Sequence, residues 1–301
     1  MRAPWRDRRG RVSWVKAAAL AVVCVPGLSM VHDWTSGGFG PLPFIGLVYW
    51  SGVWAVGLIL LTLAVTPARA LFRAPWLIDA RRIFGVATLV YTLVHVAAFA
   101  GLYKWDWPAV LRQTFTRPSL LVATASLIGL IALGATSSDA AVQRLGGRAW
   151  NRLHRANYAV SILALAHFLL SPGIFGLQYS LTGLLFWLLA WRVLDRRAGA
   201  RTPLALAGLT VAATLFVVAL EIAWLLVWQD QPPGETIETI FSLEDEVAPP
   251  WVVLASGLAV MVLAAAWAAG SKRLAAGEPG VSGKAALRIL PGKRSFLRRE
   301  P

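Results

Sequence analysis

Long apolar segments recur along this 301-residue chain, and they constrain the fold more than any other feature. A helical segment of about 20 mainly apolar residues crosses ~30 Å of hydrocarbon. The chain is 57% hydrophobic, which leaves too little polar surface for a water-soluble domain built from such helices. The sequence predicts an all-α polytopic membrane helix bundle of about eight transmembrane helices, at 13–31, 46–66, 83–103, 118–136, 153–171, 177–194, 203–228 and 251–270.

Lys and Arg residues gather on alternate connections between these segments. With the N-terminus in the cytoplasm, the outward loops carry only Lys104, Arg112 and Arg117 of the 29 basic residues. This asymmetry is typical of the positive-inside rule for short loops. We therefore expect a protein of the bacterial inner membrane, in contact with the lipid bilayer, with both termini cytoplasmic. The net charge of +14 then reflects topology and does not indicate nucleic-acid binding.

The N-terminal segment resembles a signal peptide in its basic start and apolar stretch. No small-residue cleavage site follows, and the adjacent arginines lack a twin-arginine context, so a retained first helix is predicted. The single cysteine, Cys24, excludes an internal disulfide, a CxxC pair and a cysteine-ligated cluster. Redox chemistry in this chain would need a group other than sulfur.

Three regions are predicted from the connections. Residues 1–195 form a six-helix unit, 196–270 a two-helix extension, and 271–301 a basic cytoplasmic tail that could lie on anionic lipid or stay in solvent. The extension contains an outward loop, 229–250, with six acidic and no basic residues, which could dock a basic partner or stay solvated. Glu221 in the seventh segment could handle protons, bond to another helix or reach water at the outer end.

Two histidines are predicted at one depth in the membrane. His95 and His167 each lie about a dozen residues inside a segment that starts at the cytoplasmic face, roughly 18–20 Å from the inner boundary. Imidazoles at one level on different helices suit the two axial positions of a b-type haem. Hydrogen bonding between helices is the alternative role. His32, at the outer end of the first segment, is expected to face water and headgroups.

A third histidine, His154, is predicted near the cytoplasmic surface, about 20 Å from His167 along the same segment. The equivalent position of the third segment is Arg82, so a second haem here has no obvious second histidine. His154 could hold such a haem, bind a propionate or face a quinone. Arg81 and Arg82 suit a propionate or another anionic cofactor, or anchor the helix end as basic interface residues.

Several motifs together resemble the YedZ/MsrQ family of haem-binding membrane subunits, within the ferric-reductase-like transmembrane group. The resemblance covers about residues 12–192 and matches His95, His154 and His167 to the family's haem-associated histidines and Arg81–Arg82 to its arginine pair. The chain departs from the family in YWSGVWAV, where a TGRTAL-like pattern is expected, and in its extra helices. The motifs are RRIFGVATLVYTLVH, TRPSLLVATASLIGLIALGATS and RLGGRAWNRLHRANYAVSILALAHFLLS, with VSWVK, GGFG and LTLAVTPAR upstream.

The resemblance implies an electron-transfer subunit of an oxidoreductase system rather than a complete enzyme. The implied cofactors are one or two b haems, with FMN and quinone as further candidates. The implied donor is quinol or a cytoplasmic flavin reductase, and the implied acceptor is a periplasmic molybdopterin-containing methionine sulfoxide reductase that repairs proteins. Two alternatives stay open: a ferric-reductase-like haem protein with a different periplasmic acceptor, and a non-redox transporter or scaffold.

Overall fold

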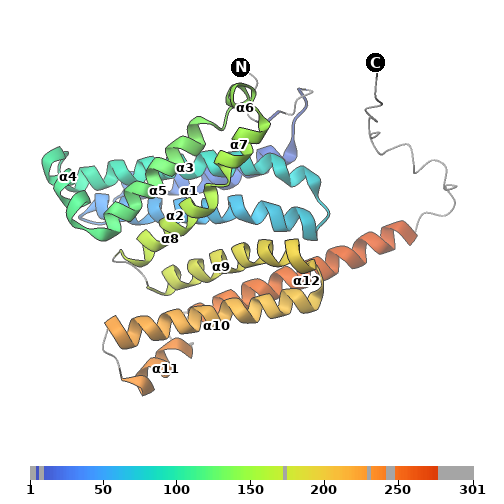
Figure 1. Ribbon diagram of the computed structural model, residues 1–301. Helices are drawn as coiled ribbons and strands as arrows, with labels where there is room; N and C mark the ends of the chain where they lie inside the picture. Colours follow the sequence, from blue (N-terminus) through green and yellow to red (C-terminus); the bar gives the residue numbers. More distant parts are fainter. Residues whose placement is uncertain (1–4, 7–9, 172–174, 229–231, 242–247, 277–301) are drawn as a thin grey trace, which may run out of the picture.

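The structure, a computed structural model, describes residues 5–6, 10–171, 175–228, 232–241 and 248–276. Long helices run side by side through most of this part of the chain, with short helices between some of them (Figure 1). Within the described ranges the regular secondary structure is helical, apart from one isolated β-bridge near the N-terminus. The predicted all-α bundle is confirmed.

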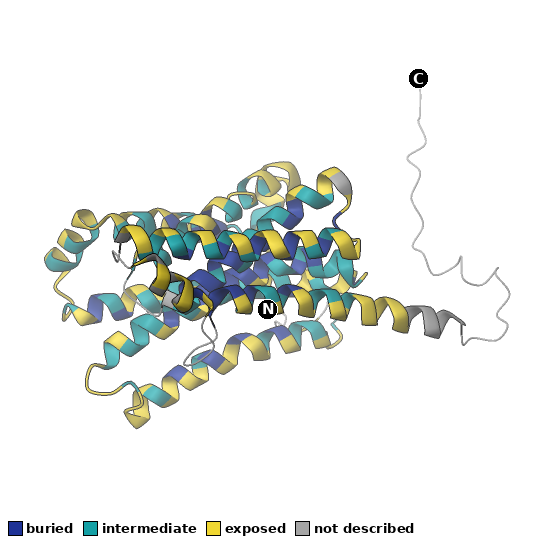
Figure 2. Ribbon diagram, turned by 90° about the horizontal axis from the view of Figure 1, so that it is seen from below, coloured by how far each residue is buried: buried dark blue, intermediate teal, exposed yellow. Residues whose placement is uncertain are grey.

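Seven helices in the described ranges are long and apolar enough to cross a membrane, so the chain is a multi-pass membrane protein. Buried residues follow the faces where these helices meet, and exposed residues follow their outer faces (Figure 2). Many of the exposed residues are large and apolar, for example Leu28 and Val262, as expected for surfaces that face lipid. The seven helices are α1 (Trp14–Ser36), α2 (Pro43–Leu71), α3 (Ile78–Leu102), α5 (Pro118–Ala135), α9 (Phe175–Ala198), α10 (Pro203–Trp228) and α12 (Pro249–Ala276).

The fifth predicted segment, 153–171, differs from the other seven. Its polar start belongs to a separate helix, α7 (Gly147–His154), and α8 (Asn157–Leu169) alone continues among the long helices. The 13 residues of α8 extend about 20 Å, less than the ~30 Å of a hydrocarbon core. The span is shorter than predicted because residues 151–154 end α7, and the chain turns at Arg155 and Ala156 before α8 begins.

The C-terminal end of α8 is covered by protein. The Gln178 side-chain amide of α9 donates to the carbonyl oxygens of Phe168 and Ser171, at 2.7 and 2.9 Å. Gln178 is fully buried, so no water is needed to satisfy these carbonyls. These two backbone acceptors at the end of the short helix are therefore satisfied by protein and not left to lipid.

Short helical elements form several of the connections that the sequence presents only as loops. The Asp106 carboxylate caps one by accepting from the Ala109 N–H, and the Ser138 hydroxyl caps another by accepting from the Ala141 N–H, both at 3.1 Å. These elements are η1 (Pro75–Leu77), α4 (Trp107–Thr116), α6 (Asp139–Leu145) and α11 (Pro233–Phe241).

Helix α2 lies at the centre of the bundle, in contact with α1, α3, α8 and α9. Helix α9 also packs against α10 and α12, so the C-terminal helices share a core with the rest of the bundle. One buried apolar cluster includes Leu63 of α2, Trp191 of α9 and Val253 of α12. Gly183 of α9 permits the close approach, since a Cβ there would lie 2.4 Å from a methyl carbon of Val217 and 2.7 Å from one of Val253.

Parts of the predicted extension and tail fall outside the described residues. Of the acidic loop, α11 is described, whereas 229–231 and 242–247 are not. Of the basic tail, the structure describes the end of α12 up to residue 276, and 277–301 lie outside the described residues. Glu221 of α10 is 6% exposed, and its Oε2 atom has no hydrogen-bond partner among the described residues.

A proline inside α2 leaves one carbonyl without its helical donor, and a side chain of α9 bonds to that carbonyl instead. Pro67 has no N–H, so the carbonyl four residues earlier, that of Leu63, loses its helical donor. The Arg192 guanidinium donates to this oxygen and, at 2.5 Å, to the Leu188 carbonyl, and it lies 5.5 Å over the Tyr158 ring. An unsatisfied carbonyl is costly in hydrocarbon, which explains why a charged side chain that is only 8% exposed is present here.

A second proline, Pro26, interrupts α1 in a similar way. The Tyr91 hydroxyl of α3 donates to the Val23 carbonyl at 2.6 Å, in the turn that Pro26 distorts. Gly27 gives the ring room, since a Cβ there would lie 3.1 Å from the Tyr91 hydroxyl oxygen. Both interrupted helices are thus bonded through their backbone to a side chain of a neighbouring helix.

The pairing of Arg192 with the gap left by Pro67 can be tested in a double-mutant cycle. Arg192→Met is expected to lower the free energy of unfolding by about 1–3 kcal/mol, because it leaves the Leu63 carbonyl without a donor. In a Pro67→Ala background the new N–H can bond Leu63, so the same change should cost less. Denaturant unfolding in detergent measures both, and equal costs in the two backgrounds would contradict the pairing.

Candidate functional site

The structure brings His95 of α3 and His167 of α8 together inside the bundle. Their ring centroids lie 6.3 Å apart, and the two ring planes meet at 77°. Both side chains are partly buried between helices. The two histidines for which equal depth is predicted are therefore neighbours in space.

Each of these imidazoles is held by a backbone carbonyl of a neighbouring helix. His95 Nδ1 lies 2.7 Å from the Val48 carbonyl oxygen of α2. His167 Nδ1 lies 3.0 Å from the Ser119 carbonyl oxygen of α5 and 3.3 Å from the Ser171 hydroxyl. A carbonyl only accepts, so Nδ1 carries the proton in both neutral rings, and each Nε2 keeps a lone pair for a metal.

The separation of the two rings fits a single metal ion between them. A metal–nitrogen bond of about 2 Å, plus roughly 1 Å from the nitrogen to the ring centre, places the centroids of two trans imidazoles ~6 Å apart. The observed 6.3 Å agrees with this value. Nδ1–H bonds to carbonyls are also the usual outer contacts of metal-bound histidines, because they fix the tautomer and raise the basicity of Nε2.

His154 lies in a different environment, at the end of α7. Its ring stacks on Trp150 with centroids 3.9 Å apart, and its Nε2 lies 3.1 Å from the Thr136 hydroxyl of α5. That hydroxyl donates to the Ala132 carbonyl at 2.8 Å, so it accepts from His154 Nε2–H. The Nε2 atom, which has no such bond in His95 and His167, is therefore hydrogen-bonded in His154.

The charge state of His154 follows from its neighbours. Burial lowers the pKa of the His154 imidazole, and the positive charges of Arg81 and Arg82 lower it further. The ring is therefore neutral at neutral pH. The remaining histidine of the four, His32, is exposed near the end of α1. His154 therefore has no second histidine beside it, unlike His95 and His167.

The two arginines of the predicted pair have different surroundings. Arg82 forms an ion pair with Asp139 of α6, with 2.7 Å between the guanidinium nitrogen and the carboxylate oxygen. Both side chains are at least half exposed, so the pair ties α3 to α6 with little net energy. Arg81 forms no ion pair with any residue that the structure describes, and it lies close enough to His154 and Arg192 to affect both electrostatically.

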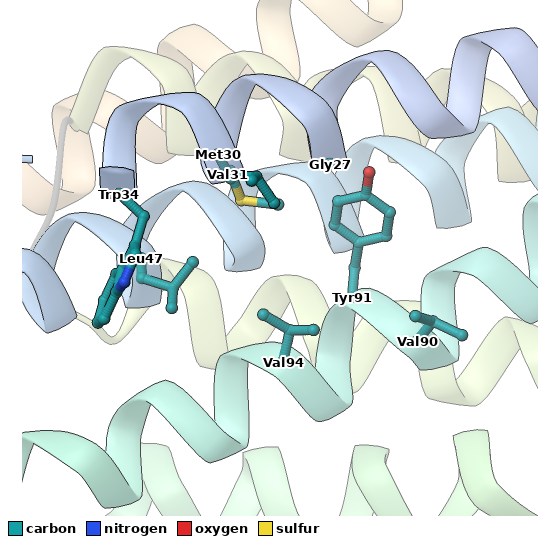
Figure 3. A pocket seen from close by; sticks show the side chains of 8 residues that line it. All are labelled: Gly27, Met30, Val31, Trp34, Leu47, Val90, Tyr91 and Val94. Carbon is teal, nitrogen blue, oxygen red and sulfur yellow. The ribbon is translucent and has the colours of Figure 1, made fainter. Parts of the chain in front are cut away.

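A separate groove of about 510 Å³ lies between α1, α2 and α3. Figure 3 shows Tyr91, Val90 and Val94 of α3 on one side of it and Met30 and Val31 of α1 on the other. The Tyr91 hydroxyl is bonded to a backbone carbonyl, and the lining has no charged or metal-binding side chain apart from the thioether of Met30. The groove suits hydrocarbon chains.

Sequence reasoning missed several residues that shape these sites. The contacts of Val48, Ser119 and Ser171 with the paired imidazoles, and that of Thr136 with His154, join different helices or turns. A serine or threonine inside a lipid-facing helix is the only sequence signal for such a contact, and most of those in this chain bond within their own helix.

Comparison with known proteins first defines the class. Residues 51–165, which contain His95 and end two residues before His167, match the family model described as "Ferric reductase like transmembrane component". Curated relatives are more specific, and three are named "Protein-methionine-sulfoxide reductase heme-binding subunit MsrQ". The chain belongs to the MsrQ family, as predicted from its motifs.

The extent of these matches is similar among the relatives. The protein of Azospira oryzae is 34% identical over 195 residues, which cover 62% of this chain and 81% of the relative. The proteins of Xanthomonas axonopodis pv. citri and Rhodospirillum rubrum are each 32% identical and cover 62% and 66% of this chain, and 88% and 95% of their own length. No solved structure matches. About a third of this chain lies outside each match.

The contact between Thr136 and His154 predicts a difference between two matched variants. Thr136→Val removes the hydroxyl that accepts from His154 Nε2 and should lower the free energy of unfolding by about 1 kcal/mol. Thr124→Val is the control, because the Thr124 hydroxyl of the same helix bonds only to the Leu120 carbonyl. Denaturant unfolding in detergent compares them, and equal losses would show that the contact contributes nothing.

Proposed function

We propose that this chain is a membrane electron-transfer subunit that binds haem b through His95 and His167. The observation that carries the proposal is the pair of imidazoles 6.3 Å apart, with both Nδ1 atoms bonded to carbonyls. The names of the relatives support haem as the cofactor. When bound, haem supplies one-electron chemistry.

The residues around the pair bind and orient. The carbonyls of Val48 and Ser119 hold the two rings in the tautomer that presents Nε2, and they raise its basicity as a ligand. The surrounding helices are apolar, so they keep water away from the site. Burial of this kind is one of the factors that set the reduction potential of a bound haem. The chain would thus hold the haem and set its surroundings, as an electron-transfer subunit does. The proposal gives it no catalytic group that acts on a substrate.

We assign Arg81 and His154 to an anionic group at the other end of α3. Arg81 has no ion-pair partner among the described residues, and the His154 ring lies beside it. A haem propionate or the phosphate of FMN fits a guanidinium in this position. A second haem on His154 is the weaker assignment, because Nε2 already bonds Thr136 and Arg82 is paired with Asp139. Quinone stays a candidate at this surface.

The proposed donor is quinol or a cytoplasmic flavin reductase, and the proposed acceptor is a periplasmic methionine sulfoxide reductase subunit containing molybdopterin. The relatives' names, which join a haem-binding subunit to a methionine sulfoxide reductase, support the acceptor. The distribution of Lys and Arg supports an inner-membrane location with cytoplasmic termini. Within this arrangement, 1–195 are the haem-binding unit, 196–270 an extension, and 271–301 a cytoplasmic tail.

A second candidate function is a haem protein of the ferric-reductase-like class with a different periplasmic acceptor. The family model that matches residues 51–165 favours it, because it describes the class and no particular acceptor. A reductase assay with the purified periplasmic partner, against one with a ferric chelate, separates the two. A non-redox transporter or scaffold is disfavoured by the paired imidazoles.

Haem binding is tested first by a reduced-minus-oxidised optical spectrum of the detergent-solubilised protein, with haem counted per chain. His95→Ala and His167→Ala should each remove the low-spin b-type α band, because one axial nitrogen is lost. His154→Ala should keep that band and remove at most a second component. His32→Ala is the matched control and should keep full haem.

Two results would contradict the proposal. One is a colourless wild-type protein purified from haem-replete cells, and the other is full haem in both variants of the pair. One haem per chain would indicate that His154 does not hold a second haem. Two haems per chain would favour His154 as a ligand of the second.

A further inference from the structure

The His95 ring packs against one turn of α2, which contains Val48, Ser51 and Gly52; this turn is called the His95 seat. The Val48 carbonyl accepts from His95 Nδ1–H at 2.7 Å. Ser51, three residues later and fully buried, shares its one hydroxyl proton between the carbonyls of Leu47, at 2.5 Å, and Val48, at 3.2 Å. The carbonyl that orients the imidazole is therefore itself held by a buried side chain of the same turn.

Gly52 provides the space on the same turn. A Cβ at this position would lie 3.0 Å from His95 Nδ1 and 3.1 Å from Cε1, closer than side-chain carbons normally approach a ring. Any side chain at Gly52 would push the ring away from α2 and lengthen its bond to Val48. Gly57, on the same helix, has nothing within 4 Å of such a Cβ, so a methyl group at that position meets no such restriction.

The orientation of the ring has a measurable consequence. The planes of His95 and His167 meet at 77°. In a low-spin ferric haem, nearly perpendicular imidazole planes make the two dπ levels nearly equal in energy, which gives a strongly anisotropic EPR signal with a large gmax. Nearly parallel planes separate the levels and give a smaller gmax. The hydrogen bond that orients the ring is also one of the outer contacts through which a protein adjusts the reduction potential of a haem.

We propose that Ser51 and Gly52 are positioning residues, which hold the His95 ring nearly perpendicular to that of His167. This inference rests on the proposed haem site and adds how its ligand geometry is set. Neither residue offers a ligand, because Gly52 has no side chain and the Ser51 hydroxyl bonds to carbonyls of its own helix. Both act through the bond between His95 Nδ1 and the Val48 carbonyl.

Gly52→Ala tests the seat, with Gly57→Ala as the matched control. Wild type and Gly57→Ala should give the large-gmax ferric signal. Gly52→Ala should shift gmax and the midpoint potential and lower haem affinity by about 10- to 100-fold, the range typical when an outer contact of a metal ligand is lost. Thermal unfolding of all three proteins checks the fold. An unchanged gmax and potential in folded Gly52→Ala would overturn the role of Gly52.

Ser51→Ala and Ser51→Thr keep the proposal testable where Gly52→Ala does not fold. Ser51→Ala removes the hydroxyl that supports the Val48 carbonyl and should shift gmax, whereas Ser51→Thr retains a hydroxyl and should restore it. A signal in Ser51→Ala identical to wild type would overturn the role of Ser51. If wild type shows no low-spin haem, the proposed function itself is contradicted. If all variants give the wild-type haem signal, only the positioning role is contradicted.

Discussion

Inside hydrocarbon no water is available to a backbone carbonyl or an imidazole N–H, and this constraint decides where the polar side chains of the bundle lie. Arg192 bonds the carbonyl that Pro67 leaves open, and Tyr91 bonds the turn that Pro26 distorts. In each case one helix supplies the donor and another the acceptor. The bonds that satisfy these groups therefore also fix how the helices are placed against one another.

The proposed redox site uses the same kind of bond. Because Nδ1 of His95 and Nδ1 of His167 both bond to carbonyls, the two Nε2 atoms are left for a metal. His154 differs from this pair, because its Nε2 lies 3.1 Å from the Thr136 hydroxyl. The hydrogen bonds that each ring makes with its neighbours therefore bear on which of its nitrogens can act as a ligand.

Hydropathy predicted the position of each long helix, because crossing hydrocarbon requires a long apolar run. Equal offsets within two segments predicted that His95 and His167 share a level, which agrees with their contact. The pairs Pro67–Arg192 and Thr136–His154 could not be predicted. The first pair depends on how two long helices that are apolar over most of their surface are rotated about their axes, and such helices carry little periodic signal of that rotation. The second pair joins the residue after α5 to the end of α7, so it depends on how the chain folds back between them.

The short helix α8 links the paired histidines to the membrane itself. A 13-residue helix cannot match an ordinary hydrocarbon thickness, and such hydrophobic mismatch is relieved by local bilayer thinning or by protein that covers the gap. Contacts with α2, α5 and α9 cover part of α8. Because this short helix carries His167, a change in bilayer thickness would act on a helix of the site itself, and acyl-chain length would join the sequence among the variables of the site.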